Sequence, residues 1–190
     1  DSSLFYTQKA FELTNKNDPN SAYPMILNSL GANYFRLGDY DNAIKYMLLT
    51  VKVTEAQDNP LRLVYAYNNL ATVMGINENY DGAIKYYKNG YQILEEIRDT
   101  TIIANLASNT AIYVKKTGNF EEARKWASKA IGLAERYNNP SAYSYGNYIM
   151  GTTEKDLDKS LIYIKKAVDK AREFQYKSIL ADALDIYGTK

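Results

Sequence analysis

A repeat with a period of 40 residues runs through this 190-residue chain, and a fixed period constrains a fold more strongly than composition does. The unit is clearest from Leu27 to Met47, where apolar and small residues at helical spacing lie on both sides of a Gly38-Asp39-Tyr40 break. The same pattern returns over Tyr67–Tyr87 and again over Ala107–Ala127, with no insertion needed. Each unit is therefore predicted to be a hairpin of two helices.

The repeat register also divides the chain. One hairpin cannot bury both of its apolar faces, so the sequence predicts an all-α, right-handed solenoid of stacked hairpins, about ten helices without strands, over residues 1–190. Its predicted parts are a lone second helix over about 2–17, units over about 21–58, 60–98, 100–138 and 140–175, and a lone first helix over about 178–188. Because capping repeats usually close such arrays, a chain that starts and stops in mid-repeat is expected to be a fragment of a longer one.

Small residues recur where the helices are expected to approach most closely. On the first helices these are Gly31, Ala71, Ala111 and Gly151, and on the second helices Ala43, Ala83, Ala123 and Ser160. Aromatic residues follow three positions later on the second helices, at Tyr46, Tyr86, Trp126 and Tyr163. At these periodic positions we expect core or half-buried packing rather than ligand contact.

The fourth unit departs from this register. Its second-helix residues Ser160, Ile164 and Ala167 arrive three positions early. We therefore expect a tighter hairpin turn near Thr153 to Asp158.

The pattern Leu27, Leu30-Gly31 and Tyr34, followed by Ala43 and Met47, resembles the tetratricopeptide repeat. The 40-residue period is similar to the longer repeats of bacterial signalling proteins, namely sensory segments of histidine kinases and membrane-linked regulators, and cytoplasmic peptide-pheromone receptors. The resemblance implies a non-enzymatic scaffold that binds a protein or an extended peptide in a groove lined by the first helices.

Composition excludes several other classes of function. The net charge is +1 and Lys and Arg are not clustered, so the sequence lacks the positively charged surface that direct binding of nucleic acid requires. No apolar run approaches the roughly 18 residues of a membrane-spanning helix, so no insertion into a membrane is expected. The absence of cysteine fits either a reducing cytoplasm or an oxidising periplasm, and localisation stays open between the two.

The sequence also offers little for catalysis. Histidine and cysteine are absent, which removes the commonest general base, the thiolate nucleophile and the usual zinc ligands. The acidic pairs Asp39/Asp41, Glu95-Glu96 and Glu121-Glu122 are expected to cap helices or face solvent, because adjacent helical residues point apart and acids favour helix starts. We predict no enzymatic activity, no metal site and no cofactor.

The resemblance places the residues just before the Leu-Gly pair in the groove, together with residues one turn to either side. The candidate groove residues are Met25, Asn28, Ser29, Tyr65, Asn68, Asn69, Asn105, Ser108, Asn109, Lys115 and Tyr145. An amide both donates and accepts hydrogen bonds, so a ladder of asparagines suits the backbone of an extended ligand. Alternatively, these amides bridge neighbouring helices. An acidic C-terminal tail is a poor ligand candidate, because the core groove positions supply amides rather than cations.

Three functions remain open on this evidence. The first is a protein- or peptide-binding segment, sensory or interacting, of a larger bacterial signal-transduction protein or transcriptional regulator. The alternatives are a structural or dimerisation spacer and a cytoplasmic receptor for a signalling peptide. Apolar residues near the two ends, Leu4, Phe5 and Phe11 and Leu180, Leu184 and Tyr187, would normally pack on neighbouring repeats, so a homo-oligomer formed through the ends of the solenoid is expected.

Overall fold

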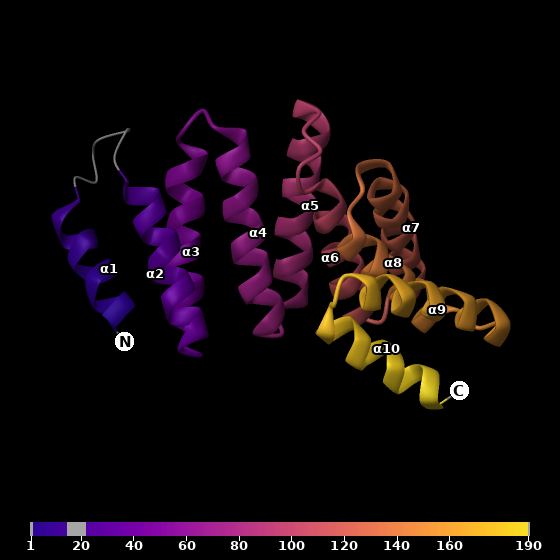
Figure 1. Ribbon diagram of the computed structural model, residues 1–190. Helices are drawn as coiled ribbons and strands as arrows, with labels where there is room; N and C mark the ends of the chain where they lie inside the picture. The colour runs from indigo at the N-terminus through magenta and orange to yellow at the C-terminus, as the bar shows by residue number, and fades with distance from the viewer. Residues whose placement is uncertain (1, 15–21, 190) are drawn as a thin grey trace. The chain divides into compact units, whose positions relative to one another are not determined.

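The structure is a computed structural model that describes residues 2–14 and 22–189, with side chains described as far as residue 183. Its described part contains ten helices and no strand, which confirms the predicted all-α fold of stacked hairpins (Figure 1). The helices are α1 (Ser2–Leu13), α2 (Tyr23–Arg36), α3 (Tyr40–Glu55), α4 (Pro60–Ile76), α5 (Tyr80–Ile97), α6 (Ile103–Lys116), α7 (Phe120–Tyr137), α8 (Pro140–Thr153), α9 (Leu157–Glu173) and α10 (Lys177–Thr189). The expected break between the lone N-terminal helix and the first unit, at about 17–21, lies outside the described residues.

The chain forms two compact units, Asp1–Ile93 and Leu94–Lys190. In the first, α2 packs on α1 and α3, and α3 packs on α4. In the second, α6 packs on α7 and α8, α7 and α9 both pack on α8, and α10 packs on α9. Apolar residues of these helices are buried in the cores of the two units, as the repeat pattern requires, whereas α1 contributes no buried residue.

The small residues at the predicted contact positions are buried, which confirms their role. The alanines and Ser160 have no exposed surface, and Gly31 and Gly151 are also buried. A Cβ atom built on Gly31 would lie 2.7 Å from Cγ of Met47 and 3.3 Å from the carbonyl oxygen of Ala43. In the fourth unit the Ser160 hydroxyl donates a hydrogen bond of 2.8 Å to the Gly151 carbonyl oxygen. The two helices of a hairpin therefore meet nearly backbone to backbone.

The aromatic residues of the second helices are half-buried, again as predicted. Tyr46 stacks on Tyr34 with ring centroids 5.4 Å apart, and Tyr86 lies 5.4 Å from Tyr67. These ring pairs join the two helices of a hairpin, which is a packing role.

Asparagine or aspartate caps the start of α3, α4, α7, α8 and α9. The side chains of Asp39, Asn59, Asn119, Asn139 and Asp156 each accept the backbone N–H of the third residue that follows, at 3.0 to 3.2 Å. Such N-caps satisfy backbone donors that have no partner within the helix. Gly38 and Gly118 turn the chain between two helices with positive φ angles of 76° and 82°.

The expected tightening of the fourth hairpin turn is wrong. Three residues separate α8 from α9, as they separate the two helices of the other three hairpins. The fourth unit is shorter because its first helix is shorter. α8 has 14 residues, whereas α4, which also begins at a proline, has 17. In place of a glycine, this turn is held by Glu154, whose carboxylate accepts the backbone N–H groups of Lys155 and Asp156 and pairs with Arg124 at 2.9 Å.

The N-terminal helix carries exposed apolar side chains. Phe5 is 59% exposed and Leu13 is 80% exposed, whereas Phe11 is half-buried and stacks on Tyr23 with centroids 5.8 Å apart. At the other end Leu180 packs against a buried cluster that includes Ile164, and the side chains of 184 and 187 lie outside the described residues. Self-association through the ends stays a prediction.

Replacing Gly151 by alanine should destabilise the second unit. The new methyl group would meet two carbons of Ile164 at 2.7 Å and the Ser160 carbonyl oxygen at 3.0 Å. Overpacking of this kind costs about 1–3 kcal/mol, more than the roughly 0.5–1 kcal/mol gained by removing a helical glycine. Gly132→Ala in α7 is the matched control, since open space surrounds its Cβ position, and it should stabilise the protein. Urea unfolding followed by circular dichroism measures both, and equal shifts would contradict the close approach.

The Glu154 turn should make stability depend on acid pH. Its hydrogen bond to Arg124, reinforced by the backbone N–H of Asp156, lowers the pKa of Glu154 from 4.5 to about 2. A lowered folded-state pKa stabilises the protein above the unfolded value, and this contribution is lost as the pH falls from about 4.5 to about 2. Glu154→Gln should therefore be less stable than the wild type at pH 7, and the two should converge toward pH 2. Thermal unfolding across this range tests it, and a difference that stays constant with pH would refute the assignment.

Candidate functional site

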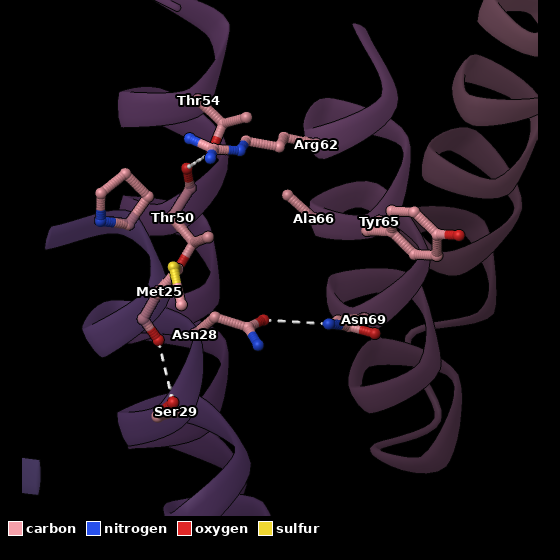
Figure 2. Close-up of a pocket in the computed structure, with 10 residues that line it drawn as sticks. Met25, Asn28, Ser29, Thr50, Thr54, Arg62, Tyr65, Ala66 and Asn69 are labelled. Carbon is pink, nitrogen blue, oxygen red and sulfur yellow. Dashed lines mark hydrogen bonds between the residues drawn. The ribbon is translucent and has the colours of Figure 1, made fainter. Parts of the chain in front are cut away.

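A pocket of about 290 Å³ lies on the first unit between α2, α3 and α4 (Figure 2). Five of the candidate groove residues line it, namely Met25, Asn28, Ser29, Tyr65 and Asn69. Met25 is 64% exposed and Tyr65 is 45% exposed, so the pocket is open to solvent at both margins. The register of the repeat explains this grouping, because equivalent positions of neighbouring first helices face the same side of the unit.

An amide bridge crosses this pocket. Nδ2 of Asn69 on α4 donates a hydrogen bond of 2.9 Å to Oδ1 of Asn28 on α2. An amide offers two donor hydrogens and two acceptor lone pairs, so one bond leaves further capacity on both side chains. In Figure 2 the nitrogen of Asn28 points away from Asn69. The bridge is the contact that the alternative interpretation of the asparagines expects, and it also holds both amides in fixed positions.

Thr50 and Thr54 of α3 form part of the pocket wall. Both are buried, and their hydroxyls donate to the carbonyl oxygens of Tyr46 at 2.9 Å and Thr50 at 2.7 Å. Their donors are therefore used within the helix, and their methyl groups and oxygen lone pairs remain to contact a ligand. The resemblance assigned the groove to the first helices alone, which is why these second-helix residues were missed.

Arg62 is another lining residue that the sequence prediction missed, together with Pro24 and Ala66. It is exposed and lies in the first turn of α4, where its backbone N–H is capped by Asn59. A signal for it was present, because Arg62, Ala66 and Asn69 are separated by four and three residues and so share one helix face. The predicted groove residues of this helix start at Tyr65, one turn after Arg62.

The remaining candidates of the first and second units are not part of this pocket. Asn68 is half-buried, and its amide lies 3.4 Å from Oδ1 of Asn69. In the second unit Asn105 accepts a hydrogen bond of 3.0 Å from Nδ2 of Asn139, and the buried Ser108 donates to the carbonyl oxygen of Asn105. Asn109 is half-buried on α6. The second unit thus also contains a hydrogen bond between two amides, which joins α6 to the N-cap residue of α8.

Lys115 and Tyr145 lie against the following helices of the second unit. The ammonium group of Lys115 is 4.9 Å from the ring centroid of Tyr148, which is a cation–π contact. Burial, and then the positive charge of Lys116, lower the pKa of Lys115, while Asp182 opposes the shift. The Tyr145 hydroxyl lies 3.1 Å from that of Ser178 on α10.

The acidic residues form no cluster suited to metal binding. Among the described residues no three His, Cys, Asp or Glu side chains come together as a metal site would require. Asp39 acts as a cap, and its hydrogen bonds to the side chain and then the backbone of Asn42 lower its pKa. Glu121 pairs with Lys125 at 2.7 Å on the surface. None of the helices within these residues is long and apolar enough to cross a membrane.

The repeat pattern, the stacked hairpins and the paired first helices are those of a tetratricopeptide repeat. This family matches residues 22–96 and, in a second alignment, residues 62–136, which together are more than half of the chain. The chain therefore belongs to the tetratricopeptide repeat family, and it is a repeat scaffold.

Solved structures with the same fold include several signalling proteins. A signal-transduction ATPase with numerous domains from Pyrococcus horikoshii, which has a tetratricopeptide repeat sensor, is 20% identical with a TM-score of 0.81 over 97% of this chain and 29% of its own. Aspartyl phosphate phosphatase F from Bacillus subtilis is 17% identical with a TM-score of 0.72 over 84% of this chain and 43% of its own. The Rap conjugation gene regulator of plasmid pLS20, in complex with a Phr peptide, is 12% identical with a TM-score of 0.73 over 97% and 52%. At these identities the similarity shows the fold, and this chain spans about half or less of each of these proteins.

The amide bridge should contribute measurably to stability. A hydrogen bond between neutral groups is worth about 0.5–1.5 kcal/mol, so Asn28→Ala and Asn69→Ala should each lower the free energy of unfolding by about that amount. The double variant should cost less than the sum of the two single variants, because either change alone removes the bond. Asn77→Ala, an exposed amide at the end of α4, serves as the control. Additive effects in urea unfolding would show that the two side chains are not coupled.

Proposed function

We propose that this chain is a non-enzymatic scaffold whose first unit binds an extended peptide or protein segment in the pocket between α2, α3 and α4. The observation that carries the proposal is the grouping of Met25, Asn28, Tyr65 and Asn69 around one open pocket. Membership of the tetratricopeptide repeat family supports it, as does the peptide complex of the Rap regulator with the same fold.

The binding chemistry divides between amides and apolar surfaces. The bridged amides of Asn28 and Asn69 supply the remaining donors and acceptors to the ligand backbone. Met25 and Tyr65, both exposed, pack against ligand side chains on either side of that bridge. Met adapts its shape and Tyr presents a rigid apolar face at low entropic cost, which suits recognition of a short segment.

The second unit provides candidates for further contacts with the same kind of ligand. Its groove positions are Asn105, Ser108, Asn109, Lys115 and Tyr145, and each is proposed to contribute after the pattern of the first unit. The hydrogen bond between Asn105 and Asn139 supports this parallel, because it also holds a groove-position amide in place.

The cellular role proposed for the scaffold is that of a sensory or interaction segment of a larger bacterial signal-transduction protein or transcriptional regulator. The similar fold of a tetratricopeptide repeat sensor and of Rap proteins supports this role. A cytoplasmic receptor for a signalling peptide is the narrower form of the same proposal.

A structural or dimerisation spacer is the second candidate. The hydrogen bonds Asn28–Asn69 and Asn105–Asn139 favour it. The first joins α2 to α4, the second joins α6 to the residue that caps α8, and both use part of the hydrogen-bonding capacity of the groove. The exposed Phe5 and Leu13 on α1 favour association with another copy of the chain.

Selection from a displayed library of random 12-residue peptides, with the whole chain as bait, tests the proposed function. Enriched peptides, made synthetically, should bind the wild type and bind Asn28→Ala and Asn69→Ala about threefold to tenfold more weakly, the loss expected for one neutral hydrogen bond. Asn77→Ala should bind as the wild type does. The site would be refuted if substitution of Asn28, Asn69, Met25 and Tyr65 left the affinity of the enriched peptides unchanged. A selection that enriches no peptide would favour the structural or dimerisation spacer.

A further inference from the structure

The pocket on the first unit carries a single ionisable charge. Of the ten residues that line it, nine are neutral and only Arg62 is charged. Figure 2 shows the Arg62 side chain extending from α4 toward the α3 wall that carries Thr54. A ligand that enters this pocket therefore meets one fixed positive charge beside neutral amides and apolar surface.

No carboxylate among the described residues forms an ion pair with Arg62. Glu55, on the same end of α3, accepts a hydrogen bond of 2.9 Å from the hydroxyl of Tyr67. Asp58 lies in the loop before α4, and among the described residues it makes no ion pair with Arg62. The guanidinium keeps its five donors in a planar fork that matches a carboxylate.

The helix that bears Arg62 adds to the positive potential. The first turn of α4 contains no acidic residue, whereas α3 and α5 carry Asp41 and Asp81 in theirs. The N-terminus of a helix carries a partial positive charge, so an anion near the first turn is stabilised. Both the side chain and the helix thus favour a negative group at this end of the pocket.

For a ligand whose backbone runs along α4, the spacing of Arg62 and Asn69 sets where on the ligand that group lies. Arg62 and Asn69 are seven residues apart on one face, which corresponds to roughly 10 Å along the helix. An extended chain advances about 3.3 Å per residue, so a ligand backbone held at Asn69 brings the residue about three positions away to Arg62.

We propose that Arg62 is the specificity-determining residue of the pocket and selects an extended segment with an Asp or Glu side chain about three residues from the backbone bound by Asn28 and Asn69. The inference rests on the proposed function, since it names the chemical class of the ligand for the same pocket. The carboxylate pairs with the guanidinium, while the amides bind the backbone irrespective of sequence.

The test compares peptide selection on three baits. Random 12-residue peptides are displayed inside a loop of the carrier protein, without a free C-terminus, and selected on the wild type, Arg62→Gln and Lys52→Gln. Lys52 is an exposed cation on α3 that does not line the pocket, so its loss changes the net charge equally. Peptides enriched on the wild type and on Lys52→Gln should share an Asp or Glu at one position, and those enriched on Arg62→Gln should not.

Titration of one enriched peptide then measures the pairing. Changing its acidic residue to Gln or Asn should weaken binding to the wild type about twofold to fivefold, the range of a solvent-exposed ion pair. The same change should have no effect on Arg62→Gln, and Arg62→Lys should recover only part of the preference because it lacks the fork. Synthetic peptides with an amidated and with a free C-terminus should bind alike, and a large gain from the free terminus would overturn the assignment to a side chain.

The two proposals fail in different ways. Enriched peptides that need Asn28 and Asn69 but share no acidic residue would overturn the role of Arg62 and leave the peptide-binding pocket standing. Peptides that depend on none of the pocket residues, or no enrichment on any bait, would overturn both.

Discussion

The close approach of the two helices of a hairpin, at buried positions occupied by glycine or alanine, is the contact on which the repeat depends. At Gly31 the partner helix comes so near that even a methyl group would collide with Met47. Because the helices are so close, the first helix of a hairpin buries one apolar face against the second helix. Its opposite side remains available to pack against the next repeat. The first helices are consequently set side by side, which is what brings Asn28 and Asn69 within hydrogen-bonding distance.

Most of the fold could be predicted because the repeat period indicates where each helix and each turn lies. Small residues, aromatic residues and turn residues recur together, so each prediction supports the others. The predicted tightening of the fourth hairpin turn was wrong because a unit shorter by three residues is visible in the sequence only as an early position of Ser160 and Ile164. Periodicity cannot say whether the helix or the turn is the shorter part, and here Glu154 builds a turn of ordinary length while α8 loses its last residues.

The candidate site could be predicted only in part. Repeat register predicts which face of a helix lies in the groove, and three of the residues on that face, Met25, Asn28 and Asn69, line one pocket. Register does not identify how far along that face the pocket extends, nor which second-helix residues form its wall. Arg62, Thr50 and Thr54 were missed for these reasons, since their inclusion depends on the separation and tilt of α3 and α4. Side-chain bridges, such as Asn105 with Asn139 across 34 positions, depend on the same geometry.

The bridging and the binding interpretations of the asparagines need not compete. A bridge uses one donor of Asn69 and one acceptor of Asn28, and it fixes two side chains that would otherwise lose rotational freedom when a ligand binds. Preorganised groups bind more tightly because that ordering has already taken place on folding. A ligand that bonds to the bridged pair would in turn stabilise the stacking of α2 on its neighbours, since any ligand that binds only the folded state shifts the folding equilibrium toward it. In a repeat array, where each hairpin is stabilised chiefly by its neighbours, a contact between adjacent first helices is the place where occupancy of the groove can alter the stability of the stack.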